Sequence, residues 1–207
     1  WLDALCVAHG LTGFGAGGGG GVRVDGPPHR AILTFPGMAE RVVKLGSAGK
    51  IFGLTGWKIG WMIAAPKLAE GLARAHQFVT YTSAPALQWA VAEGLALGDG
   101  WFAARNAGWA ASRERLRAGL AAAGYTVLPN AATWFLCVDL AASGIALDDR
   151  EFSRRALEEC GVASIPVSAL YEGEGAPGNI VRFCFTKPDL MLDEAAERLA
   201  AFRASLA

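Results

Sequence analysis

The spacing of apolar residues predicts amphipathic helices in the middle and at the end of the chain. Residues 66–79 repeat apolar side chains at helical spacing, and the proline at position 66 suits the first turn of a helix. Pro85 opens a second helical stretch, and residues 101–123 are predicted as one long helix. A last helix is predicted from Asp189 or Asp193, with its buried side at Leu192, Ala195, Leu199 and Phe202.

Shorter runs of alternating or β-branched residues between these helices predict strands. The predicted strands cover residues 41–45, 57–63, 125–128, 134–138 and 180–185. Asp148 or Asp149 can cap a further helix that runs to about Cys160. The mixture predicts an α/β protein whose last part is an α+β unit, with one small sheet covered by helices. Because the helix over residues 101–123 is long enough to bridge two domains, the boundary is placed near residue 110.

The first 24 residues differ from the rest because they contain the glycine-rich sequence GFGAGGGGG. A glycine loop can cradle a phosphate, so a nucleotide site is one interpretation. The glycine run is long, however, and no clear strand precedes it. We therefore expect residues 1–24 to be a linker or a disordered segment, followed by domains at 25–110 and 111–207.

Composition excludes several classes of protein. The 207 residues are 53% hydrophobic, enough for a sizeable core, and the net charge of zero argues against nucleic-acid or anionic-membrane partners. No apolar run reaches the roughly 20 residues of a membrane span, and the start of the chain has no basic signal-peptide region. Three of the four scattered cysteines lie in apolar sequence and are interpreted as reduced core residues, which favours a cytoplasmic location. No metal site is expected.

The chemistry of the chain is centred on the stretch SAGKIFGLTGWKIG, residues 47–60. It is predicted to place Lys50 among small residues on a loop between two strands, with Ser47 before it and Lys58 after it. A lysine amine that attacks an aldehyde must be partly deprotonated, which desolvation or a nearby cation such as Lys58 can achieve. Ser47 and Lys58 could also hold a phosphate. The alternative is that both lysines are ordinary exposed residues.

This stretch resembles the pyridoxal-phosphate attachment site of the class I aminotransferases, where Ser-x-Gly-Lys is followed by a cation. The residues SAGK, TGWK and GW are most similar to the subgroup of kynurenine, glutamine and methionine aminotransferases. Lys58 stands where the wider class usually has arginine, and that subgroup commonly has lysine there. The resemblance implies the C-terminal part of a fold type I transferase, comprising a partial large domain and an α+β small domain.

A second motif lies in the strand VRFCF, which contains Arg182. An arginine on a half-buried strand needs an anion, and its planar fork suits a carboxylate, although a structural ion pair would also satisfy it. The sequence from residue 161 to residue 185 resembles the small domain of the same subgroup, where this arginine binds the α-carboxylate of the amino acid. Residues 132–135, ATWF, likewise resemble the family's Gly-Thr-Tyr-Phe.

The resemblance implies transamination between an amino acid and a 2-oxo acid, with pyridoxal phosphate held by Lys50, Ser47 and Lys58. Lys50 would also carry the proton between the α-carbon and the cofactor, and Arg182 would orient the substrate. The subgroup favours apolar, aromatic, sulfur-containing or glutamine side chains and forms homodimers. A β-lyase acting on cysteine-type substrates would use the same lysine.

Family members are about twice as long as this chain, and their N-terminal halves supply a phosphate-binding glycine loop, a ring-stacking aromatic residue and the pyridinium partner. No such residues are found in this sequence, which also lacks an initial methionine. We therefore expect an N-terminally truncated aminotransferase of weak or no activity. The alternative from another class is a non-catalytic remnant, which would not bind the cofactor.

Overall fold

The computed structural model of the protein describes residues 31–206, which divide into two compact units. The first unit ends at Trp101 and the second begins at Phe102. This division falls inside the long helix α4 (Asp99–Ala122). The bounds of α4 are close to the predicted helix over residues 101–123. The boundary expected near residue 110 lies in the same helix, and the expected linker at residues 1–24 lies outside the described residues.

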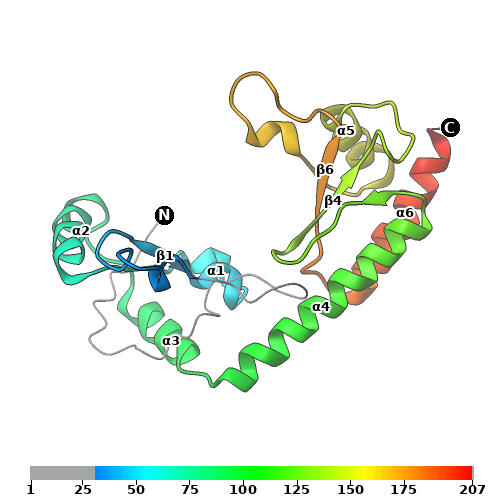
Figure 1. Ribbon diagram of the computed structural model, residues 1–207. Helices are drawn as coiled ribbons and strands as arrows, with labels where there is room; N and C mark the ends of the chain where they lie inside the picture. The colour runs from blue at the N-terminus through cyan, green and yellow to red at the C-terminus, as the bar shows by residue number, and fades with distance from the viewer. Residues whose placement is uncertain (1–30, 207) are drawn as a thin grey trace. The chain divides into compact units, whose positions relative to one another are not determined.

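The first unit is built on an antiparallel hairpin (Figure 1). Its strands are β1 (Lys44–Ser47) and β2 (Gly60–Ile63), and between them lie the one-turn helix α1 (Ala48–Ile51) and the 3-10 helix η2 (Thr55–Trp57). The hairpin is preceded by the 3-10 helix η1 (Ile32–Thr34) and followed by helices α2 (Pro66–Val79) and α3 (Pro85–Leu95). A proline opens each of these two helices, which confirms the predicted starts.

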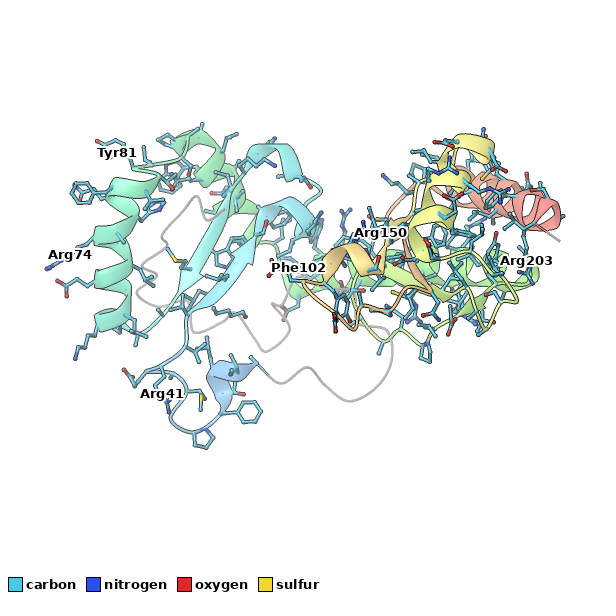
Figure 2. The ribbon with its side chains drawn as sticks, turned by 90° about the horizontal axis from the view of Figure 1, so that it is seen from above. Arg41, Arg74, Tyr81, Phe102, Arg150 and Arg203 are labelled. Carbon is cyan, nitrogen blue, oxygen red and sulfur yellow. The ribbon has the colours of Figure 1, made fainter. Side chains whose placement is uncertain are left out.

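The first unit has a small core among the described residues. Its buried members are Ala48, Ile59, Trp61 and Val91. Large apolar side chains elsewhere in the unit are exposed, including Phe78 at 86% and Tyr81 at 76%. Figure 2 shows Tyr81 projecting from the chain just after α2. The core thus joins α3 to the hairpin that carries the lysine motif, while the apolar side chains at the end of α2 are exposed.

Trp61 and Gly46 form a close cross-strand pair that fixes the hairpin. The two residues lie opposite each other, and a Cβ atom built on Gly46 would lie 2.2 Å from the Trp61 ring. We expect Gly46→Ala to displace the ring and destabilise the first unit by about 1–3 kcal/mol, the usual cost of overpacking. Thermal unfolding measures this change. Gly71→Ala on the exposed face of α2, where a Cβ meets nothing within 4 Å, is the control and should not destabilise the protein. An unchanged Gly46→Ala protein would contradict the packing.

The second unit is an antiparallel sheet of four strands in the order β3-β4-β6-β5. The strands are β3 (Thr126–Val127), β4 (Phe135–Asp139), β5 (Ile165–Pro166) and β6 (Ile180–Cys184). The unit also contains helix α5 (Asp149–Cys160), the 3-10 helix η3 (Val167–Leu170) and helix α6 (Asp189–Ser205). Figure 1 shows β4 and β6 side by side at the centre of this sheet.

Helices cover one face of this sheet and leave the other face only partly buried. Leu136 and Val181, from the two central strands, pack with Leu120 of α4 and Phe152 of α5 in one core. Leu192, Leu199 and Phe202 of α6 complete it, as the apolar pattern predicted. The alternate residues of the central strands lie on the opposite face, where Phe135 and Arg182 are half-buried and Cys184 is exposed. The expected α+β unit is therefore confirmed.

Two expectations about local structure were wrong. The first strand begins at Lys44 rather than at residue 41, because Arg41 still belongs to a turn in which its N–H donates to Met38 O at 3.0 Å. Of the cysteines in residues 31–206, Cys160 packs half-buried against the core at the end of α5, but Cys137 is half-buried and Cys184 exposed on the outer face of the sheet. Strand alternation explains the second error for Cys137 and Cys184, since a cysteine between apolar neighbours points away from the core that those neighbours fill.

Within residues 31–206, no helix is long and apolar enough to cross a membrane. The same part of the chain contains no group of three acidic, histidine or cysteine side chains placed to share a metal ion.

Candidate active site

Lys50 lies on the one-turn helix α1 and not on the loop that the sequence predicted. The correction follows from Ser47, whose hydroxyl accepts a hydrogen bond from Gly49 N at 3.2 Å and so caps the helix. A second bond, from Thr55 Oγ1 to Gly49 O at 3.1 Å, ties α1 to η2. Lys50 itself is exposed and has no hydrogen bond or ion pair with any described residue. Its amine is therefore not engaged by any other group of residues 31–206.

Lys58 is brought back toward Ser47 by the hairpin. Ala48 N donates a hydrogen bond to Ile59 O at 3.0 Å, across the connection between the two strands. Ser47 precedes Ala48 and Lys58 precedes Ile59, so each of the two residues is next to one end of this bond. Lys58 adopts the left-handed conformation with φ of 56°, which is uncommon for a residue with a side chain. It is exposed, and it pairs with no carboxylate among residues 31–206. Ser47, Lys50 and Lys58 thus place a hydroxyl and two amines, none of them in an ion pair with residues 31–206, in and beside the connection between the two strands.

These three side chains fit the needs of pyridoxal phosphate. The cofactor requires a primary amine for its aldehyde and donors for its phosphate, and Lys50 supplies the amine while Ser47 and Lys58 supply a hydroxyl and an ammonium group. Gly49 keeps the backbone compact beside Lys50, since a Cβ there would lie 3.1 Å from Thr55 Cα. The donor set is therefore suitable for the cofactor.

Arg182 lies in the second unit, on the outer face of the sheet. It is opposite Cys137 on one side and Ile165 on the other. Its Nε atom is buried and has no hydrogen-bond partner among the described residues, and no carboxylate there pairs with its guanidinium. The structural ion pair considered from the sequence is thus absent from residues 31–206. An arginine in this state can donate hydrogen bonds to an external carboxylate.

The neighbours of Arg182 on this face are mostly apolar or neutral. The guanidinium carbon lies 4.0 Å from the centre of the Phe135 ring. Burial raises the pKa of the Cys137 thiol, an effect that the charge of Arg182 partly opposes, so this thiol stays neutral near pH 7. Asp139 is further along the strand, and its carboxylate accepts bonds from Ala142 N and from the Asn179 amide. No carboxylate of residues 31–206 therefore neutralises the guanidinium of Arg182 on this face.

Sequence reasoning missed the role of Asp149, which anchors the segment before β6. Asp149 is 1% exposed, and its carboxylate accepts bonds from Ser168 N at 2.7 Å and from Ser168 Oγ at 2.9 Å. Its own backbone N–H donates to Gly178 O at 2.7 Å. Both ends of residues 168–178 are thus fixed to the start of α5. The sequence showed Asp149 only as one of two possible helix caps, and the structure assigns the cap to Asp148.

We expect Asp149→Ala to destabilise the second unit by about 1–3 kcal/mol, because it leaves the Ser168 N–H without its partner. Amide hydrogen exchange should also accelerate across residues 168–178. Asp148→Ala is the matched control, since it removes the cap of α5 at a cost of about 1 kcal/mol without touching Ser168. Equal exchange in this segment for both variants would show that Asp149 does not anchor it.

The sequence matches the family described as aminotransferase class I and II over residues 12–199. A relative in Mycobacterium tuberculosis, named a probable N-succinyldiaminopimelate aminotransferase, is 39% identical and is matched over 85% of this chain and 46% of its own length. The methionine aminotransferase of Escherichia coli is 33% identical, over 83% of this chain and 44% of its own. A kynurenine–oxoglutarate transaminase of Dictyostelium discoideum is also 33% identical, over 84% and 45%.

Solved structures agree with these relatives. The N-succinyldiaminopimelate aminotransferase of Mycobacterium tuberculosis superposes with a TM-score of 0.81 at 39% identity, covering 87% of this chain and 47% of that one. The Escherichia coli protein with methionine aminotransferase function gives 0.80 at 31% identity with the same coverage. The chain thus spans about half the length of the relatives it matches. Its fold is the C-terminal part of a fold type I transferase, and the chain belongs to the class I and II aminotransferases, which depend on pyridoxal phosphate.

Proposed function

We propose that this chain carries the cofactor-attachment and carboxylate-binding residues of an enzyme that transfers an amino group between an amino acid and a 2-oxo acid. The observation that carries the proposal is the hairpin of Ser47, Lys50 and Lys58, in which two amines and a hydroxyl lie close in the chain with no carboxylate paired to them among the described residues. Pyridoxal phosphate, when bound, supplies the electron sink for the chemistry.

Each of the four residues has a proposed role. Lys50 Nζ would attach the cofactor and, as a general base, would carry the proton from the α-carbon of the substrate to the cofactor. Ser47 Oγ and the Lys58 ammonium group hold the phosphate. The Arg182 fork binds the α-carboxylate with two parallel hydrogen bonds, which orients the substrate. Family membership and the placement of each residue support these assignments.

The proposed substrate is an amino acid with an apolar, aromatic, sulfur-containing or glutamine side chain. The face around Arg182 supports this class, because Phe135, Cys137 and Ile165 present no charge beside the guanidinium. The relatives named for methionine and kynurenine act on amino acids of this kind. The proposal also includes a homodimer in the cytoplasm, and light scattering of the purified protein measures the oligomeric state.

Product analysis tests the proposed reaction. The purified chain is incubated with pyridoxal phosphate, 2-oxoglutarate and a panel of methionine, kynurenine, phenylalanine, glutamine and aspartate. Because the chain spans about half the length of its relatives, we propose a turnover well below that of a full-length relative, with the first four amino acids preferred over aspartate. Formation of the matching 2-oxo acid, lost in Lys50→Ala, supports transamination. A cysteine conjugate is assayed separately, and pyruvate and ammonia formed from it would instead indicate a β-lyase. No product with any substrate would favour a non-catalytic chain.

A further inference from the structure

The aromatic contact of Arg182 gives this residue a fixed position on the sheet. Phe135 pairs with Cys184 and Arg182 pairs with Cys137, so Phe135 and Arg182 are diagonal neighbours on the same face of adjacent strands. The guanidinium carbon lies over the Phe135 ring at 4.0 Å from its centre, well inside the roughly 6 Å limit of a cation–π contact. The contact therefore follows from the register of β4 and β6.

A ring contact leaves the hydrogen-bonding edge of arginine unused. All N–H groups of a guanidinium lie in its plane, and a carboxylate binds at the edge of that plane. An acidic neighbour would occupy this edge, whereas the Phe135 ring takes no N–H. Among the atoms of Arg182, only Nε is buried without a partner, and the two terminal nitrogens are neither buried nor hydrogen-bonded to any described residue. The fork thus remains open to solvent while the side chain is held in place.

From this arrangement we infer that Phe135 is a positioning residue for Arg182, holding its guanidinium so that the fork is ready for a substrate carboxylate. The inference rests on the carboxylate-binding role of Arg182 proposed above. A long, unrestrained arginine must lose rotamer freedom when it binds, and a contact that orders the side chain beforehand reduces this cost. Removing the ring should therefore weaken carboxylate binding about three- to tenfold, the range of an ordinary cation–π contact.

Chemical modification of Arg182 tests this inference on the whole chain. Phenylglyoxal is allowed to react with the purified protein, and peptide mass spectrometry measures the rate at Arg182 with increasing 2-oxoglutarate or benzoate. The concentration that halves the rate reports carboxylate binding without requiring catalysis. Arg154, on the exposed face of α5, is read in the same spectra as an internal control for reagent activity.

Four variants separate positioning from general damage. We expect Phe135→Leu and Phe135→Met to raise the half-protecting concentration three- to tenfold, whereas Phe135→Tyr, which keeps a ring, stays within twofold of the wild type. Ile165→Ala removes the apolar neighbour on the other side of Arg182 and should also stay within twofold. Circular dichroism checks the fold, and the two ringless variants provide alternatives should one fail to fold.

The outcomes distinguish this inference from the function on which it rests. If carboxylates protect Arg182 equally in the wild type and in both ringless variants, Phe135 does not position Arg182, and the proposed function is untouched. An equal loss in Ile165→Ala would also overturn the inference, since any apolar neighbour would then serve. If carboxylates fail to protect Arg182 in the wild type, the carboxylate role itself is wrong, and the inference falls with it.

Discussion

The Lys50→Ala chain is expected to give no visible absorbance band with pyridoxal phosphate beyond that of the free cofactor, whereas the unaltered chain gives the shifted band of a lysine-bound cofactor. The reason is that Lys50 supplies the only amine assigned to the aldehyde, and alanine has none. Lys50 is exposed and makes no hydrogen bond or ion pair with any residue in the range 31–206, so its removal should not disturb the fold. The loss should be complete rather than graded.

Lys58→Ala provides a matched control for this experiment. It removes an exposed amine from the same hairpin, but one assigned to the phosphate rather than to the aldehyde. We expect the band to persist and the half-saturating cofactor concentration to rise about tenfold or more, the value of one charge-assisted hydrogen bond. A band that survives in Lys50→Ala, or that disappears only in Lys58→Ala, would contradict the assignment.

Replacing Arg182 is expected to have the second largest effect. Arg182→Gln removes both the charge and the fork, and we expect the half-saturating concentration of a substrate carboxylate to rise about 100-fold, or about 2.7 kcal/mol. Arg182→Lys keeps the charge but cannot bind in the bidentate manner, so an intermediate loss is expected. Titration of the cofactor band with amino acid or 2-oxo acid measures these concentrations.

Arg154→Gln is the control for the Arg182 variants. It removes an arginine of the same unit that forms surface ion pairs with Glu151 and Glu158, and such exposed pairs contribute little to stability. The half-saturating concentrations of the substrates should not change in this variant. If Arg182→Gln and Arg154→Gln behaved alike, the α-carboxylate would have to bind elsewhere.

The parts of the fold that depend on local pattern could be predicted from the sequence. The helices that begin at Pro66 and Pro85 and the buried side of α6 follow from apolar spacing and from proline at the first turn. The one-turn helix that contains Lys50 could not be predicted in this way, because four residues are too few to show a helical period. Its signal was Ser47, a residue type that commonly caps helices.

The surroundings of the candidate site depended on contacts between distant residues. Arg182 was identified from its motif, but its partner Phe135 follows from the pairing of β4 with β6, and a shift of one position would place the two side chains on opposite faces. Asp149 looked like a helix cap, and its contact with Ser168 depends on how the segment after β5 folds back. Neither contact has a signature in the local sequence.

The most direct test of the account is to find which lysine holds the cofactor. The purified chain is mixed with pyridoxal phosphate and reduced with borohydride, and the modified peptide is identified by mass spectrometry. The account predicts a single predominant label on Lys50, with Lys44, Lys58 and Lys67 modified only at the level of a denatured control. A label spread evenly over the lysines, or concentrated on one other than Lys50, would contradict the proposal that this hairpin is the cofactor site.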